Sequence, residues 1–138
     1  MIYFIDTNIF LRTLINDNAR MHQSCIEFLS RVKTNTLYAK TATIVLAEAM
    51  WTLMSYYQLS RDDSAAAVQS IINLRGLTIV DQYNHSLAIK LFQSSSVKYI
   101  DALIASISPV YQQEWTVISY DKDFDKLNVL RKEPENIP

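Results

Sequence analysis

The chain has 138 residues, 49% of them hydrophobic, which predicts one globular domain over residues 1–138 that buries roughly two-thirds of its unfolded surface. Its longest apolar stretches fall far short of the ~20 residues that span a bilayer, and its start lacks a signal-peptide pattern, so we expect no membrane partner and a cytoplasmic location. The formal net charge of −1 gives no globally basic footprint for nucleic acid, but bound cations would change the balance locally.

The first 33 residues predict a buried strand followed by two helices. Residues 2–5 are apolar without alternation, as in a fully buried strand of a parallel sheet. Thr7 or Asn8 can cap a helix that ends near Leu14. Residues 19–33 then place apolar side chains at spacings of three and four, which is typical of an amphipathic helix.

A second strand and a strongly apolar helix follow. Residues 37–39 predict the strand, and the hydroxyl groups of Thr41 and Thr43 can cap a helix over residues 44–54. Because this helix is apolar nearly all round, we expect it to be buried on several sides. Its one charged residue is Glu48.

The middle of the chain contains the only glycine. Ser60, three residues before Asp63, resembles a capping box that opens a helix over residues 62–74, and Gly76 suits the left-handed residue that ends it. Loops that cradle phosphate in the P-loop and dinucleotide classes need several glycines, and a G-x-S-x-G nucleophile elbow needs two. A single glycine therefore excludes all three kinds of site.

The second half of the chain continues the alternation of strands and helices. Residues 77–80 predict a third strand, and Asp81 the cap of a helix that ends near Phe92. Residues 99–107 predict another apolar helix, which Pro109 ends or kinks.

The last segment completes the predicted fold. Residues 115–119 predict a fourth strand and residues 120–126 a turn into a short helix, while residues 131–138 are expected to form a tail with an edge segment and a frayed end. Strands that alternate with helices at this spacing predict a three-layer α/β/α domain with a mainly parallel sheet of four to five strands.

Three acidic residues are each the only charge in an uncharged segment of the chain: Asp6, Glu48 and Asp101. An isolated buried carboxylate costs several kcal/mol, so it must be paired, protonated or bound to a cation. Taken alone, Asp6 can be a helix cap, and Asp101 can favour the positive end of its helix. Glu48 is harder to explain in this way, because it lies in the middle of an apolar helix.

A second acidic group, Asp121, Asp123 and Asp125, lies in a turn, where a run of charges is usually solvated. Asp121, however, follows the fourth predicted strand as Asp6 follows the first, so both are expected at the carboxyl edge of the sheet, where α/β proteins bind ligands. Crowded carboxylates repel one another unless a cation is present, and hard oxygen ligands select Mg²⁺ or Mn²⁺.

No other residue type offers a competing catalytic arrangement. His22 and His85 lack the spacing of metal ligands, which argues against zinc. The lone cysteine, Cys25, has no partner for an internal disulfide, in agreement with a reducing compartment, and it has little support as a nucleophile.

The acidic residues occur in motifs that resemble those of PIN-domain nucleases, especially the VapC type of toxin ribonuclease. The resemblance covers most of the chain, from about residue 2 to residue 130. It rests on four motifs in order: Asp6-Thr-Asn8 after the first strand, Glu48 in an apolar helix, Tyr99-Ile-Asp101-Ala, and Ser119-Tyr-Asp121-Lys-Asp123.

The resemblance implies a metal-dependent endoribonuclease. In such an enzyme Asp6, Glu48, Asp101 and Asp121 would be the catalytic residues and would hold one or two Mg²⁺ or Mn²⁺ ions, with Asp123 as a supporting acidic ligand. By similarity, Asn8 and Ser119 would orient the acidic residues. The resemblance further implies a homodimer and, for toxin members, a small antitoxin protein that blocks the acidic cleft.

The chemistry of such a site agrees with the residue types. Hydrolysis of a phosphodiester needs a strong nucleophile and relief of negative charge on the phosphoryl oxygens, and divalent ions held by carboxylates can supply both. Four basic residues lie close in sequence to the acidic positions and can either hold the RNA backbone or be solvated surface charges: Arg12, Lys40, Lys98 and Lys122.

Other functions agree less well with the same residues. A haloacid-dehalogenase-like phosphatase would have Asp-x-Asp after its first strand, where this chain has Asn8. A receiver domain has no role for Glu48 within a helix. An RNA-processing PIN nuclease without an antitoxin and a non-catalytic PIN-like module that binds RNA or protein remain as alternatives, although a non-catalytic module would be free to lose its costly buried charges.

Overall fold

The computed structural model of the protein describes residues 1–138 and contains one five-stranded sheet in which every pairing is parallel. The strands are β1 (Ile2–Ile5), β2 (Tyr38–Thr41), β3 (Leu77–Ile79), β4 (Trp115–Ile118) and β5 (Leu130–Lys132). Their order across the sheet is β3-β2-β1-β4-β5, which puts β1 at the centre. Phe4 and Ile5 of β1 are fully buried, as its uninterrupted apolar sequence predicts.

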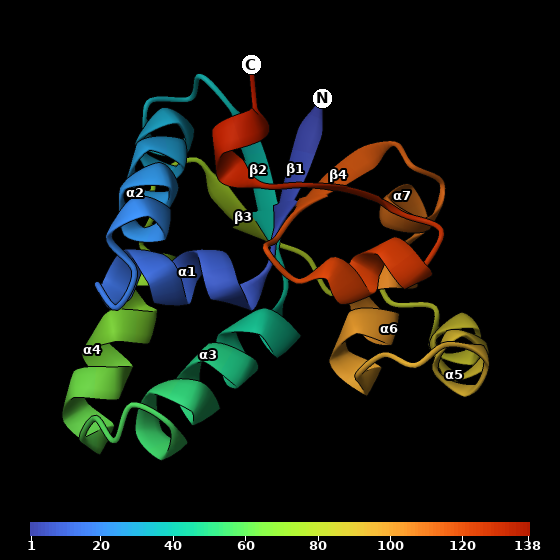
Figure 1. Ribbon diagram of the computed structural model, residues 1–138, viewed down its shortest axis with the longest axis horizontal. Helices are drawn as coiled ribbons and strands as arrows, with labels where there is room; N and C mark the ends of the chain where they lie inside the picture. The colour runs from blue at the N-terminus through green and yellow to red at the C-terminus, as the bar shows by residue number, and fades with distance from the viewer.

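Seven α-helices surround the sheet. They are α1 (Thr7–Leu14), α2 (Ala19–Lys33), α3 (Thr43–Ser55), α4 (Arg61–Ile72), α5 (His85–Ser94), α6 (Tyr99–Ala105) and α7 (Ser108–Tyr111), with short 3-10 helices η1 (Lys122–Lys126) and η2 (Pro134–Asn136). Figure 1 shows α1 and α2 on one side of the sheet and α6 and α7 on the other. This confirms the predicted three-layer α/β/α fold. None of the helices is both long and apolar enough to cross a membrane.

Helix α3 is less buried than its composition predicts. It packs against α1 and α4, and its buried residues, Val45, Ala49 and Leu53, form a single stripe at a spacing of four. Trp51 on another face is 70% exposed. The expectation of burial on several sides is therefore wrong, because an apolar sequence does not specify how many neighbours a helix has.

Three of the predicted helix caps are also wrong. Thr43 lies inside α3, and Thr41 lies in β2 with its hydroxyl donating to the Ile5 carbonyl, so neither caps that helix. Thr7 and Asn8 lie inside α1, whose N-cap residue is Asp6, without a side-chain capping bond. Asp81 caps α3 instead of the helix that follows it: its carboxylate accepts hydrogen bonds from the Thr43 amide (2.9 Å) and the Thr43 hydroxyl (2.6 Å). Helix α5 begins later, after the capping residue Asn84. Sequence proximity suggested the nearer helix, whereas the sheet brings Asp81 to the start of α3.

The predicted start of α4 is confirmed, and the glycine after that helix adopts the predicted left-handed conformation. The Ser60 hydroxyl accepts a hydrogen bond from the Asp63 amide. Gly76 has φ +87° and lies in the turn that the Leu77 amide closes by donating to the Leu74 carbonyl. Helix α4 ends earlier than predicted, at Ile72 with the capping residue Asn73, so Gly76 is not the residue that ends it.

Gly76→Ala is expected to lower the free energy of unfolding by about 2 kcal/mol or more. The new Cβ would both require a left-handed alanine and overlap the carbonyl oxygen of Val32. Urea denaturation measures the change. Gln58→Gly is the matched control, since Gln58 is an exposed non-glycine residue with φ +56°, where glycine is expected to be neutral or stabilising. Equal stability of Gly76→Ala and the wild type would contradict the steric explanation.

The end of the chain does not fray as expected. Strand β5 is the edge strand, but η2 packs against α2, where Pro134 and Ile137 are buried. The Arg31 guanidinium donates to the carbonyl of Ile137, and Glu135 accepts hydrogen bonds from Arg20 and Tyr120. These contacts tie the last residues to the α2 side of the sheet.

Candidate metal centre

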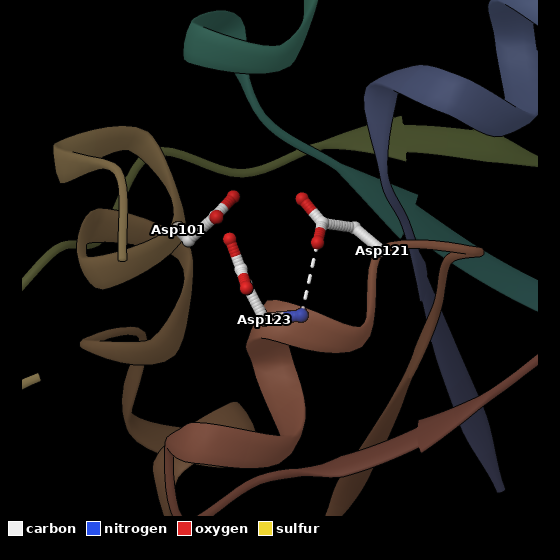
Figure 2. Close-up of side chains that lie close together, drawn as sticks. All are labelled: Asp101, Asp121 and Asp123. Carbon is white, nitrogen blue, oxygen red and sulfur yellow. Dashed lines mark hydrogen bonds between the residues drawn. The ribbon is translucent and has the colours of Figure 1, made fainter. Parts of the chain in front are cut away.

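Three aspartates come together beyond the carboxyl edge of the sheet. Asp101 lies in the first turn of α6, while Asp121 and Asp123 lie where the chain leaves β4 and enters η1. Figure 2 shows their carboxylates facing a common space, and one oxygen atom of each lies within 4.8 Å of the other two. The Asp123 amide donates to Asp121 Oδ1 (2.9 Å), which fixes the turn between these two residues. A single cation can therefore be reached by three carboxylate oxygens.

Asp101 is the buried member of this group. Its residue is 1% exposed, and its Oδ2 atom has no hydrogen-bond partner. Burial raises the pKa of Asp101 to about 7; the positive charge of Lys98 opposes this shift, and the charges of neighbouring carboxylates reinforce it. An unpartnered, buried oxygen on a carboxylate that lies beside two other carboxylates is a costly arrangement without a cation.

Asp6 lies in a hydrogen-bonded cradle at the end of β1. Its Oδ2 atom accepts hydrogen bonds from Ser119 Oγ (2.7 Å) and Asn8 Nδ2 (3.0 Å), and its amide donates to the Ile118 carbonyl of β4. Burial raises the pKa of Asp6 to about 6, although the hydrogen bonds from Ser119 and the Thr7 amide oppose the shift. Asp6 lies outside the group of three aspartates but acts on it electrostatically, because its charge raises the pKa of Asp101.

Asn8 and Ser119 connect the ends of the two central strands. The Asn8 amide donates to Ser119 Oγ (2.9 Å) and accepts a hydrogen bond from the Tyr120 amide (3.1 Å). Ser119 Oγ in turn accepts from the Asp121 amide (3.0 Å). The same two side chains thus hold the Asp6 carboxylate and the backbone that carries Asp121, which is the geometry expected of residues that orient the acidic groups.

Glu48 joins the site through Lys98. It is the half-buried residue of α3 next to the buried stripe, with a side chain 17% exposed. The Nζ atom of Lys98, at the N-cap position of α6, lies 3.5 Å from Glu48 Oε2 and 3.8 Å from Asp121 Oδ2. Glu48 is absent from the group of three aspartates, so its place at the same centre rests on this shared lysine and on its electrostatic effect on Asp6.

The basic residues near the acidic motifs behave differently from one another. Arg12 pairs with Asp17 (2.8 Å), a residue outside the acidic group. Lys126, which the sequence did not single out, lies 3.0 Å from Asp123 Oδ1 and donates to the Ser96 carbonyl. The spacing of three residues between Asp123 and Lys126 within a helical turn is the sequence signal that could have indicated this pair.

The histidines and the cysteine lie outside the acidic group. His22 Nδ1 is hydrogen bonded with the Arg12 carbonyl (2.8 Å), and His85 begins α5 beside the ring of Tyr83. Cys25 is buried, and burial raises the pKa of its thiol to about 11. A thiol of this kind is protonated near neutral pH and is therefore a poor nucleophile.

The donor set fits a hard divalent cation. All the converging groups are carboxylates, which Mg²⁺ and Mn²⁺ prefer as ligands. The buried Oδ2 atom of Asp101 has no hydrogen-bond partner, and a bound cation would satisfy it. Neighbouring Asp121 and Asp123 are only half-buried, so one side of the site is open to solvent. The arrangement suits an ion that also has to meet a substrate.

Comparisons with known proteins agree with the fold. The family model described as PIN domain matches residues 3–130. No curated protein matches the chain in sequence. Three solved structures are similar to nearly the whole chain. The first is VapBC2 from Rickettsia felis bound to a promoter DNA fragment (TM-score 0.70, 20% identity, 96% of this chain and 98% of that one). The second is VapBC-1 from nontypeable Haemophilus influenzae (TM-score 0.65, 16% identity, 99% and 100%). The third is VapC20 from Mycobacterium tuberculosis, a toxin that cleaves the sarcin–ricin loop (TM-score 0.61, 15% identity, 92% and 98%).

At 15–20% identity these structures establish a shared fold and nothing finer. The family match is stronger, because it spans all four acidic motifs and nearly the whole chain. The chain therefore belongs to the PIN-domain family.

Proposed function

We propose that the protein is a divalent-metal-dependent endoribonuclease and the toxin of a toxin–antitoxin pair. The observation that carries the nuclease assignment is the meeting of Asp101, Asp121 and Asp123 around one space, with a buried oxygen of Asp101 left without a partner. Membership of the PIN-domain family supports the same chemistry.

In this proposal Asp101, Asp121 and Asp123 hold one Mg²⁺ or Mn²⁺ ion, and Asp6 and Glu48 complete the catalytic acidic groups. A bound ion of this kind neutralises phosphoryl oxygens and activates water for attack on phosphorus. Ser119 and Asn8 hold the Asp6 carboxylate in place through hydrogen bonds of 2.7 and 3.0 Å. Burial of Asp6 and Asp101 keeps water away from the base of the site, which strengthens the electrostatic interactions there.

The toxin role, the RNA substrate and the protein partners rest on the structural relatives. Two of the similar structures are VapBC proteins, and a third is a toxin that cleaves the sarcin–ricin loop. By analogy we propose a cytoplasmic homodimer that a cognate antitoxin inhibits. Two alternatives remain. An RNA-processing nuclease without an antitoxin would lack a neighbouring antitoxin gene, and a non-catalytic binding module would not cleave RNA.

Cleavage of a mixed RNA pool tests the catalytic part of the proposal. The wild-type protein is expected to cut RNA with Mg²⁺ or Mn²⁺ and to stop when EDTA is added, and Asp6→Asn and Glu48→Gln are expected to be inactive but folded by circular dichroism. Unchanged cleavage in EDTA would overturn the metal dependence. Unchanged cleavage by either variant would remove that residue from the catalytic set.

A further inference from the structure

One lysine occupies the position of a counter-ion in the acidic site. Lys98 Nζ contacts two of the proposed catalytic carboxylates at once, Glu48 (3.5 Å) and Asp121 (3.8 Å), which come from α3 and from the turn after β4. These elements are 73 residues apart in sequence, from residue 48 to residue 121. No other basic residue forms an ion pair with two of the proposed catalytic carboxylates.

The contacts of Lys98 are those of a charge held by attraction and not by hydrogen bonds. Charge-assisted hydrogen bonds between ammonium and carboxylate groups are about 2.7–2.9 Å long. Both Lys98 contacts are longer, at 3.5 and 3.8 Å, and neither is a hydrogen bond. By contrast, Arg131 holds Asp125 with two hydrogen bonds of 2.9 and 3.2 Å. A Lys98 ammonium held in this way can leave its carboxylates without breaking a directional bond.

Exposure of the Lys98 side chain favours the same conclusion. The side chain is 55% exposed, so its ammonium can turn towards solvent without crossing packed side chains. The side chains of Glu48 and Asp121 are more enclosed, at 17% and 26% exposed, and are therefore more restricted than the Lys98 side chain. The carboxylates are therefore the fixed partners and the lysine is the exchangeable one.

We propose that Lys98 is a built-in counter-ion whose charge, held between Glu48 and Asp121, opposes a divalent metal at Asp121 and so sets the metal affinity of the site. This rests on the proposed metal dependence. With no metal bound, the ammonium reduces repulsion between carboxylates from two separate elements. A metal ion at Asp121 would repel the ammonium that lies 3.8 Å from the same carboxylate, and Lys98 would move towards solvent on the open side of the site.

Calorimetric titration of the purified protein with Mn²⁺ or Mg²⁺ alone, without RNA, tests this. Lys98→Met keeps a side chain of similar length but removes the charge, and it is expected to bind metal roughly tenfold more tightly, because a unit positive charge a few ångströms from the ion has been removed. Lys98→Arg keeps the charge and is expected to stay within about threefold of the wild type. Lys90 is an exposed lysine on α5, so Lys90→Met is the control for loss of charge elsewhere. Lys90→Met is expected to leave the metal affinity unchanged.

Thermal unfolding without metal gives a second readout that does not depend on activity. Lys98→Met is expected to melt at a lower temperature than the wild type in EDTA. Saturating metal is expected to raise the melting temperature of Lys98→Met by more than that of the wild type. Unchanged or weaker metal binding by Lys98→Met would overturn the inference while leaving the proposed function intact. Absence of metal binding by the wild type would overturn the proposed function itself, and the inference with it.

Discussion

Asp101→Asn is expected to lower the rate of RNA cleavage by about 10³-fold or more while raising the melting temperature of the metal-free protein. The amide has the shape of the carboxylate but no charge to offer a cation, and loss of metal-ion stabilisation is worth several kcal/mol of activation free energy. In the metal-free protein, the same change removes a buried charge whose Oδ2 atom has no partner. The new amide can also donate to the nearby carboxylates of Asp121 and Asp123.

Opposite effects on activity and stability distinguish a metal ligand from a structural residue. Cleavage is measured at saturating Mg²⁺, and thermal unfolding is followed at pH 8 in EDTA, where the wild-type Asp101 carboxyl is charged. Asp125→Asn is the matched control, because Asp125 is an exposed carboxylate of η1 that pairs with Arg131 outside the group of three aspartates. This variant is expected to keep its activity and to gain no stability. Full activity of Asp101→Asn would remove Asp101 from the metal site.

The metal-free protein is expected to become less stable as the pH rises from about 5 to about 8. Burial raises the pKa of Asp6 to about 6 and that of Asp101 to about 7, from an ordinary value near 3.8. Between the ordinary and the raised pKa values, the folded protein holds protons that the unfolded chain has released. Stability is therefore complete below the ordinary pKa and is lost as the pH passes the raised values.

The size of this loss is expected to be a few kcal/mol, since one pKa unit corresponds to about 1.4 kcal/mol. Carboxylates with lowered pKa values, such as Asp81 and Asp125, act in the opposite direction, but only in more acidic solution. Urea denaturation in EDTA at several pH values measures how steeply the free energy of unfolding falls with pH. Saturating Mg²⁺ should abolish this fall, and Asp101→Asn should reduce it. A stability that rises between pH 5 and 8 in EDTA would contradict the burial of these two charges.

Local patterns were sufficient for most of the secondary structure. The apolar stretch at residues 2–5 and the three-to-four spacing at residues 19–33 correspond to β1 and α2, because both depend only on which side chains face the core. The capping role of Ser60 and the left-handed Gly76 were also predictable, since each depends on contacts with the nearest few residues or on backbone sterics.

Contacts between distant elements were not predictable in the same way. Asp81 caps α3 instead of the nearer α5 because parallel pairing of β2 with β3 brings it to the start of α3. The end of the chain packs against α2 because η2 meets that helix, and nothing in its Pro-containing sequence indicates this partner. Burial of α3 on one side alone likewise depends on where α1 and α4 lie.

The acidic site divides along the same line. The sequence by itself determined that Asp6, Glu48 and Asp101 are isolated charges in apolar segments, which is why they stood out as candidates for a cation site. Only the tertiary structure decided that Asp101, Asp121 and Asp123 face one space, that Ser119 and Asn8 hold Asp6, and that Lys98 bridges Glu48 and Asp121. The physical reason is that charge isolation is a property of neighbours along the chain, whereas a metal site depends on distances that parallel strands and their following helices create.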